Sequence, residues 1–218
     1  MTHVSTVSPS PDVARRVGAW DRLANVVIDP AAAFQGIDTH PVWAVAFAAL
    51  VALRFGSLFV FYQPETNAAK VLAGVLFQVF TLMPLVAIAT TLLWVTSMLW
   101  TARLTWTSAW CITMHVTFAY TLATVAIAGV AGALLPESAA VDLRNPPFTN
   151  LGFLVTGDPA SVLHVLAVEA DVRSGYAAVL TWLGVRAASQ ARGAESALIV
   201  LTCFAAAALT ACCVALLR

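Results

Sequence analysis

The segment between Lys70 and Arg103 is the strongest constraint on the fold, because its 32 residues carry no charged side chain. As a helix it would be roughly 48 Å long, whereas the hydrocarbon core of a bilayer is about 30 Å thick. We therefore predict a membrane-spanning helix that tilts, protrudes or bends, with Pro84 as the place for a helix kink. The weaker alternative is two short segments, broken at Pro84, that form a re-entrant pair.

Composition supports the same class. Hydrophobic residues make up 61% of the 218 residues and charged residues 10%, with 11 acids against 11 bases. Soluble domains have about 45–50% apolar and about 25% charged residues. These values argue against a soluble globule and against a disordered chain, which is poor in apolar residues. Zero net charge and the lack of a basic run argue against nucleic acid as a partner.

The apolar runs predict an all-α membrane protein with five transmembrane helices in a domain over 42–217. The expected spans cover about 42–62, 71–101, 109–135, 172–190 and 196–217. The fourth is the weakest, because its uncharged part is short and lies between charged residues. Four spans are the alternative, with 172–190 on the membrane surface.

The distribution of Lys and Arg predicts the orientation. Five spans put six of these cations on the N-terminal side and four on the other. Because short cytoplasmic loops are enriched in Lys and Arg, we expect the N-terminus in the cytoplasm and the C-terminus outside.

The segment before the first span divides in two. Residues 1–12 are expected to be a disordered tail, and 13–41 a cytoplasmic, amphipathic helical segment. Its apolar residues recur at helical spacing, with a polar side opposite them. The helix could lie in the membrane interface or pack against the protein's own spans, two readings that the pattern does not separate. The expected interfacial residues are Arg15, Arg16, Trp20 and Arg22.

The loop between the third and fourth spans contains one further helix signal. Asp158-Pro159 resembles a helix cap and first turn, and it precedes Val162, Leu163 and Leu166. We expect a short outer-loop helix that lies on the outer membrane surface.

Arg54 is the most informative polar residue, because it lies inside the first span. A charge at mid-depth costs about 2.5–3.5 kcal/mol and usually faces the bundle or water. Gln78 and Tyr120 fall at similar depth, so hydrogen bonds from Arg54 to them, or to carbonyls near Pro84, are expected. The functional interpretation is an anion or lipid-headgroup pocket. The alternative is a structural arginine that extends outward or binds carbonyls.

His115, in the third span, completes this predicted intramembrane polar cluster. A hydrogen-bonded packing role is expected for it, rather than a proton relay or a metal ligand. His164, Glu169 and Asp171 are spaced too unevenly to share one helical face, so no metal is expected. The four cysteines lie in apolar runs and read as small core residues.

Catalytic motifs for proteases, hydrolases and nucleotide-binding proteins do not occur in the sequence. No enzyme activity and no cofactor are therefore expected.

Small residues recur four apart at Ala207, Ala211 and Ala215, and also at Gly129 and Ala133. Such spacing lets helices approach closely, within one chain or in a homo-oligomer.

Several segments resemble the Ypt-interacting protein (Yip) family of small polytopic membrane proteins. One segment runs from Leu23 to Ile37, with Asp29-Pro30 and then Phe34, and is followed by Pro41-Val42-Trp43. A second is the aromatic start of the third span, Trp110 to Tyr120. Asn150-Leu151-Gly152 and the approach to the fourth span from Asp171 to Gly184 are also similar. Thr121 stands where the family often has Pro.

The resemblance implies a non-catalytic scaffold or accessory subunit of a membrane export or trafficking complex. About forty residues precede the first span, as in the short-armed bacterial members, which implies the bacterial inner (plasma) membrane. An ABC-type export system, or another membrane protein, is then the expected partner besides the lipid bilayer. The short arm does not favour a Rab-type GTPase. The alternative function is a small transporter or channel subunit with an Arg54-centred polar site.

Overall fold

The computed structural model describes residues 18–61, 68–100, 102–134, 149–155, 161–189 and 191–216. Within these ranges the chain is helical and forms no β-strand, so the predicted all-α class is confirmed; one isolated antiparallel bridge joins Asn150 and Asp171. The helical elements, in chain order, are α1 (Ala19–Ile28), α2 (Pro30–Ala33), α3 (Ala44–Phe61), α4 (Ala68–Leu99), α5 (Trp106–Leu134), the 3₁₀ turn η3 (Gly152–Leu154), α6 (Val162–Glu169), α7 (Val172–Ala188) and α8 (Gly193–Leu216).

Three helices of the described chain are long and apolar enough to cross a membrane. They contain the segments Leu72–Leu99 of α4, Trp106–Ala133 of α5 and Gly193–Thr210 of α8. Helix α3 contains a shorter apolar segment, Ala44–Ser57. Helices α3 and α7 coincide with the other two predicted spans, but the number of crossings stays a prediction, as do the orientation and the type of membrane.

Helix α4 runs through Pro84 as one element of 32 residues. The alternative of two segments broken at Pro84 is therefore wrong. Proline removes one backbone donor, but the helical turns on both sides remain intact here, so a single missing hydrogen bond does not divide the helix.

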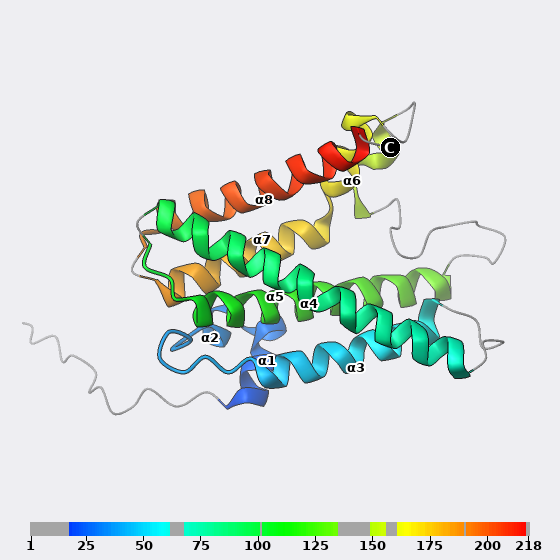
Figure 1. Ribbon diagram of the computed structural model, residues 1–218, viewed down its shortest axis with the longest axis horizontal. Helices are drawn as coiled ribbons and strands as arrows, with labels where there is room; N and C mark the ends of the chain where they lie inside the picture. Colours follow the sequence, from blue (N-terminus) through cyan, green and yellow to red (C-terminus); the bar gives the residue numbers. More distant parts are fainter. Residues whose placement is uncertain are drawn as a thin grey trace, which may run out of the picture.

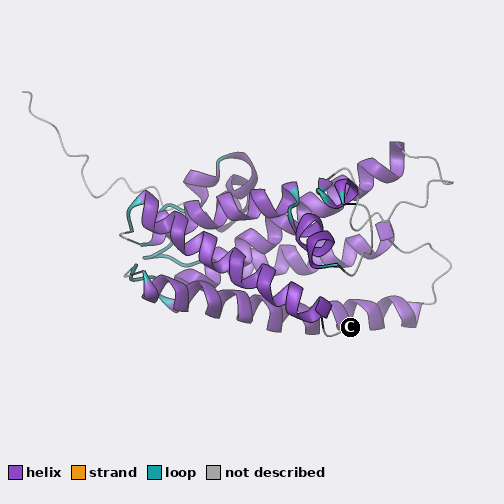
Figure 2. Ribbon diagram, turned by 90° about the horizontal axis from the view of Figure 1, so that it is seen from above, coloured by secondary structure: helices purple, strands orange, loops and turns teal. Residues whose placement is uncertain are grey.

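Helix α5 is the centre of the bundle and contacts α1, α3, α4 and α7. Helix α8 packs against α4, α6 and α7. Figure 1 shows the long helices running along one axis, with α2 near one end and α6 near the other. Figure 2, seen from above, shows the same lengthwise arrangement. We refer to the two ends as the α2 end and the α6 end.

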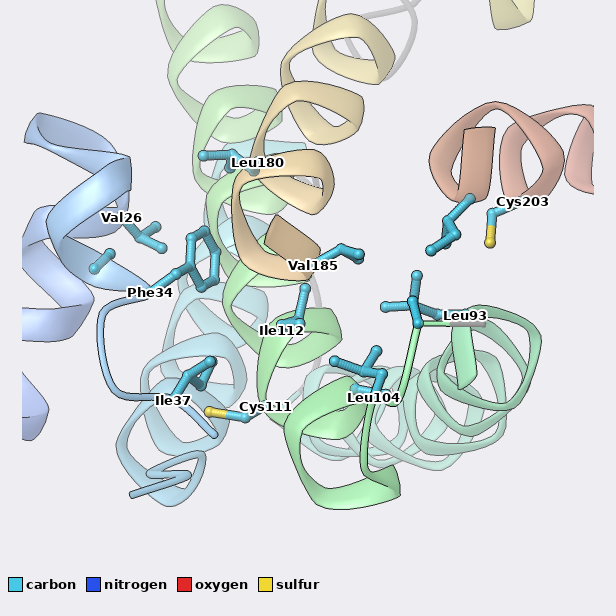
Figure 3. Packing of buried hydrophobic residues seen from close by; sticks show 14 of the residues in the cluster. Val26, Phe34, Ile37, Leu93, Leu104, Cys111, Ile112, Leu180, Val185 and Cys203 are labelled. Atoms are coloured by element: carbon cyan, nitrogen blue, oxygen red, sulfur yellow. The ribbon is translucent and has the colours of Figure 1, made fainter. Parts of the chain in front are cut away.

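The core joins the N-terminal segment to the bundle. Figure 3 shows Phe34 and Ile37 on one side, Ile112 of α5 in the middle, and Leu93 and Cys203 on the far side. Helices α5 and α7 approach closely because Gly184 has no side chain: a Cβ there would lie 2.8 Å from Cγ2 of Ile112. The sequence placed the cysteines in the core, and Cys111, Cys203 and Cys212 are buried, whereas Cys213 is exposed.

Helix α1 corrects one sequence prediction. Arg22 is an expected interfacial residue, but it is buried together with Leu23 and Val26. Trp20 and Ile28 are instead 70% and 80% exposed. The helix contacts α2, α3 and α5, as expected for the alternative in which it packs against the protein's own helices. Arg15, Arg16 and the predicted tail over 1–12 lie outside the described residues.

Two turns connect α1 to the bundle. Asp29 caps α2 by accepting a hydrogen bond from the Ala32 amide at 3.2 Å. Gly36 then has a φ of 65°, a left-handed conformation that glycine adopts without steric cost. These turns direct the chain from α2 back toward the start of α3, and they enclose the buried side chains of Phe34 and Ile37.

Candidate functional site

The predicted polar cluster begins at Arg54 of α3. Its Nε atom is buried and has no hydrogen-bond partner within the described chain, and the same holds for Oε1 of Gln78 on α4. Arg54 and Tyr120 lie within electrostatic range of each other. A direct contact between Arg54 and Tyr120 stays a prediction. No hydrogen bond between Arg54 and Gln78 is formed among the described residues.

A second arginine, which the sequence reasoning missed, reaches the same tyrosine. The guanidinium carbon of Arg173, on α7, lies 5.7 Å from the centre of the Tyr120 ring, a distance typical of a cation–π contact. Its Nη1 donates a hydrogen bond of 3.5 Å to the Thr124 hydroxyl, one turn further along α5. Arg173 thus links the start of α7 to Tyr120 and Thr124 of α5.

Arg173 is neutralised by Asp171 in the one salt bridge of the described chain. Nε of Arg173 donates to Oδ2 of Asp171 at 2.7 Å, and Nη2 contacts the same oxygen. Oδ1 of Asp171 accepts from the Arg173 backbone amide at 2.6 Å, so Asp171 also caps α7. Both side chains are almost completely buried.

The ion pair also holds the described end of the loop before η3. The Thr149 hydroxyl donates to Oδ2 of Asp171 at 3.4 Å, and Asn150 pairs with Asp171 through the isolated bridge. Oδ1 of Asn150 accepts from the Gly152 amide at 2.8 Å. The loop before η3 is therefore anchored to the start of α7. In the sequence Asp171 directly precedes the fourth predicted span and Arg173 lies at its start, and the segment around Asn150 packs against both.

His115 does not belong to this cluster, which corrects the predicted grouping. Residues 115 and 120 are five apart on α5 and therefore point to different sides of the helix. Nδ1 of His115 lies 2.8 Å from the Cys111 carbonyl oxygen and 3.7 Å from Cys111 Sγ. Its ring meets that of Phe34 edge to face, with 6.3 Å between centres. His115 thus has the hydrogen-bonded packing role that we expected.

Arg22, a second fully buried arginine, lies near His115, toward the α2 end. Arg22 is 2% exposed, and its Nη2 donates to the Gln35 carbonyl at 3.2 Å. Its Nε and Nη1 atoms are buried and have no hydrogen-bond partner within the described chain. This cation is stabilised by a neutral carbonyl rather than by a carboxylate.

The chemistry available at these sites is binding by positive charge. The Arg54 guanidinium could hold an oxyanion, whereas Arg173 is already paired with Asp171. No three His, Cys, Asp or Glu side chains within the described ranges are close enough together to bind a metal ion.

Comparisons of the chain with protein-family models, curated proteins and solved structures found no match.

Proposed function

We propose that this chain is a non-catalytic integral membrane protein that acts as a scaffold or accessory subunit. The observation that carries the proposal is the outward apolar surface of α1. Trp20, Val27 and Ile28 are 70%, 47% and 80% exposed and lie on the side of α1 that faces away from the bundle. We call these three residues the α1 surface.

The α1 surface is held rigidly by the other side of the helix. Leu23 and Val26 are buried, and the Tyr176 hydroxyl of α7 donates to the Val26 carbonyl at 3.1 Å. Arg22 ties α1 to the turn after α2 through the Gln35 carbonyl. A surface that is already ordered loses little conformational entropy on binding, which favours a stable protein contact.

The resemblance to the Yip family suggests the kind of partner. A membrane component of an ABC-type export system, or another protein of a membrane trafficking complex, would contact the α1 surface. A homo-oligomer through the small residues of α8 is compatible with this role.

Affinity capture in mild detergent from the native membrane tests the proposal. The wild type should retrieve one partner at constant stoichiometry, and the variant W20S/I28S should lose at least nine-tenths of it. Leu163→Ser is the matched control, because Leu163 is 67% exposed on α6, near the other end of the molecule. Equal retention by W20S/I28S and wild type would contradict a scaffold role for this surface.

The Arg54 region favours a second candidate function, a small transporter or channel subunit. The supporting observation is that Nε of Arg54 and Oε1 of Gln78 are buried and have no hydrogen-bond partner among the described residues, so both retain hydrogen-bonding capacity for a solute. Arg54 has no carboxylate partner in the described chain, which favours an anionic solute.

Reconstituted vesicles separate the two candidates. The purified protein alone should release an entrapped anion such as phosphate under the second candidate, and Arg54→Leu should abolish this flux. Arg103→Leu serves as the control, because Arg103 is exposed between α4 and α5. Flux that is absent from the wild type, or unchanged in Arg54→Leu, would count against an Arg54-centred transport site.

A further inference from the structure

A cavity of about 210 Å³ lies between α4, α5, α7 and α8. Its inner wall consists of buried residues, among them Leu93, Ile112 and Cys203. Ala89 of α4 and Ala207 of α8 also line it, and both are exposed. The cavity therefore opens sideways, between two helices, at a rim of small side chains.

The arrangement of α4 and α8 explains this opening. Trp100, which directly follows α4, donates a hydrogen bond of 3.3 Å from Nε1 to the Thr202 hydroxyl of α8. From there the two helices diverge toward the α6 end, as Figure 1 shows. The space between them is too wide for alanine side chains to close, and α5 and α7 form its inner wall.

The lining offers almost no polar group to a ligand. The hydroxyls of Thr113, Thr117 and Thr181 all donate to carbonyls of their own helices, at 2.7–2.9 Å. A buried water needs two to four polar partners, whereas an apolar cavity of about 150 Å³ stays dry and can hold benzene. This cavity is larger than that, so its lining favours a hydrocarbon segment over water or a polar solute.

The depth of the cavity identifies the source of the hydrocarbon. Ala89 lies ten residues from Leu99, and Cys203 ten residues from Gly193, so each is roughly 15 Å from that end of its helix. Three of the four helices around the cavity are those long and apolar enough to cross a membrane. In a hydrocarbon core of about 30 Å, the cavity falls near the midplane, where lipid chains end.

We propose that the cavity binds the terminal part of a phospholipid acyl chain, which enters from the bilayer between Ala89 and Ala207. The alternative occupant is a helix from a second copy of the protein. Such a helix has a diameter of about 10 Å, so it could cover the rim but could not fill the cavity. An unbranched chain fits the apolar lining. The site goes beyond the proposed scaffold role and does not depend on it.

Photochemical labelling in lipid nanodiscs tests the site. The full-length protein is incorporated with phosphatidylcholine that carries a diazirine either at the end of one acyl chain or next to its carbonyl. The terminal probe should label the peptides that contain Ile112 and Cys203, and the carbonyl-proximal probe should label them at least fivefold less. Replacing phosphatidylcholine by phosphatidylglycerol should leave the terminal labelling within twofold.

Cavity-filling variants provide the decisive comparison. Ala207→Phe should reduce terminal labelling of both peptides at least fivefold, and Ala89→Phe should do the same from the opposite rim. Ala205→Phe is the matched control, because Ala205 is exposed on α8 but does not line the cavity. Size-exclusion profiles identify any variant that fails to fold. If one of the two cavity-filling variants does not fold, the labelling of the other one tests the proposal.

Three results would overturn the proposal. The first is equal labelling of wild type and a folded cavity-filling variant. The second is stronger labelling by the carbonyl-proximal probe, which would place headgroups rather than chain ends at this depth. The third is labelling that disappears as the protein-to-lipid ratio rises, which would indicate that a second copy covers the rim.

Discussion

Arg173, toward the α6 end, and Arg22, toward the α2 end, are both almost completely buried, yet their environments differ. Arg173 meets a carboxylate, a hydroxyl and an aromatic ring. Arg22 meets one backbone carbonyl, and two of its nitrogen atoms have no hydrogen-bond partner in the described chain. Burial alone therefore does not show how much a charge contributes to the fold. The partners decide that, since a paired charge links elements whereas an unpaired one mainly costs desolvation.

The largest effect is expected from Asp171→Ala. This change leaves the Arg173 guanidinium buried without its carboxylate and removes the cap of α7, so the free energy of unfolding should fall by about 3–5 kcal/mol. Reversible unfolding by sodium dodecyl sulfate in mixed micelles measures it. Asp38→Ala is the control, because Asp38 is exposed and should change stability by less than about 0.5 kcal/mol.

A double variant distinguishes pairing from burial at the same site. Asp171→Ser with Arg173→Met keeps a capping hydroxyl and removes both charges, so it should be more stable than Asp171→Ala. A double variant as unstable as Asp171→Ala would show that the loop requires the ion pair itself.

The next effect concerns the packing of α7 against α5, which links the two regions. Gly184→Ala should destabilise the protein by about 1–3 kcal/mol, because the added methyl group would overlap Ile112. Gly175→Ala on the same helix has open space and should raise stability by about 0.5–1 kcal/mol. The same unfolding titration measures the free energy of unfolding of both variants. Equal values for Gly184→Ala and Gly175→Ala would mean that α7 shifts away from α5 without cost.

A smaller loss is expected from Tyr176→Phe. The hydroxyl of Tyr176 joins α7 to the Val26 carbonyl of α1, and a neutral hydrogen bond contributes about 0.5–1.5 kcal/mol. Hydrogen exchange of the α1 amides should rise in this variant, while exchange of the α6 amides stays unchanged. Unchanged exchange in α1 would indicate that Leu23 and Val26 hold the helix without this bond.

The smallest effect is expected from Arg22→Met, although Arg22 is as deeply buried as Arg173. The variant loses one hydrogen bond but no longer has to bury an unpaired charge, so its stability should lie within about 1 kcal/mol of wild type. Arg173→Met alone should cost several times more, because it leaves Asp171 unpaired. Similar losses in the two Met variants would remove the distinction between the two buried arginines.

Hydrophobic patterning located the helices closely. The predicted spans 109–135 and 196–217 differ by at most three residues at either end from α5 and α8, and the predicted outer-loop helix corresponds to α6. Uncharged runs of this length have few alternatives in lipid, because backbone groups there must be satisfied within the helix. The positions of Arg54 and Tyr120 near the middle of their helices also follow from the sequence, whereas a direct contact between them stays a prediction.

The remaining interactions depend on how the helices turn toward one another. The helical pattern of α1 placed Arg22 on the polar side, but the turns at Asp29 and Gly36 press that side against α5. Asp171 and Arg173 are buried because the segment around Asn150 packs against them. Local composition specifies which residues avoid water, because transfer into lipid acts on each residue separately. The rotation and crossing of the helices decide which polar atoms meet and where a cavity remains. Both arise from contacts between distant parts of the chain.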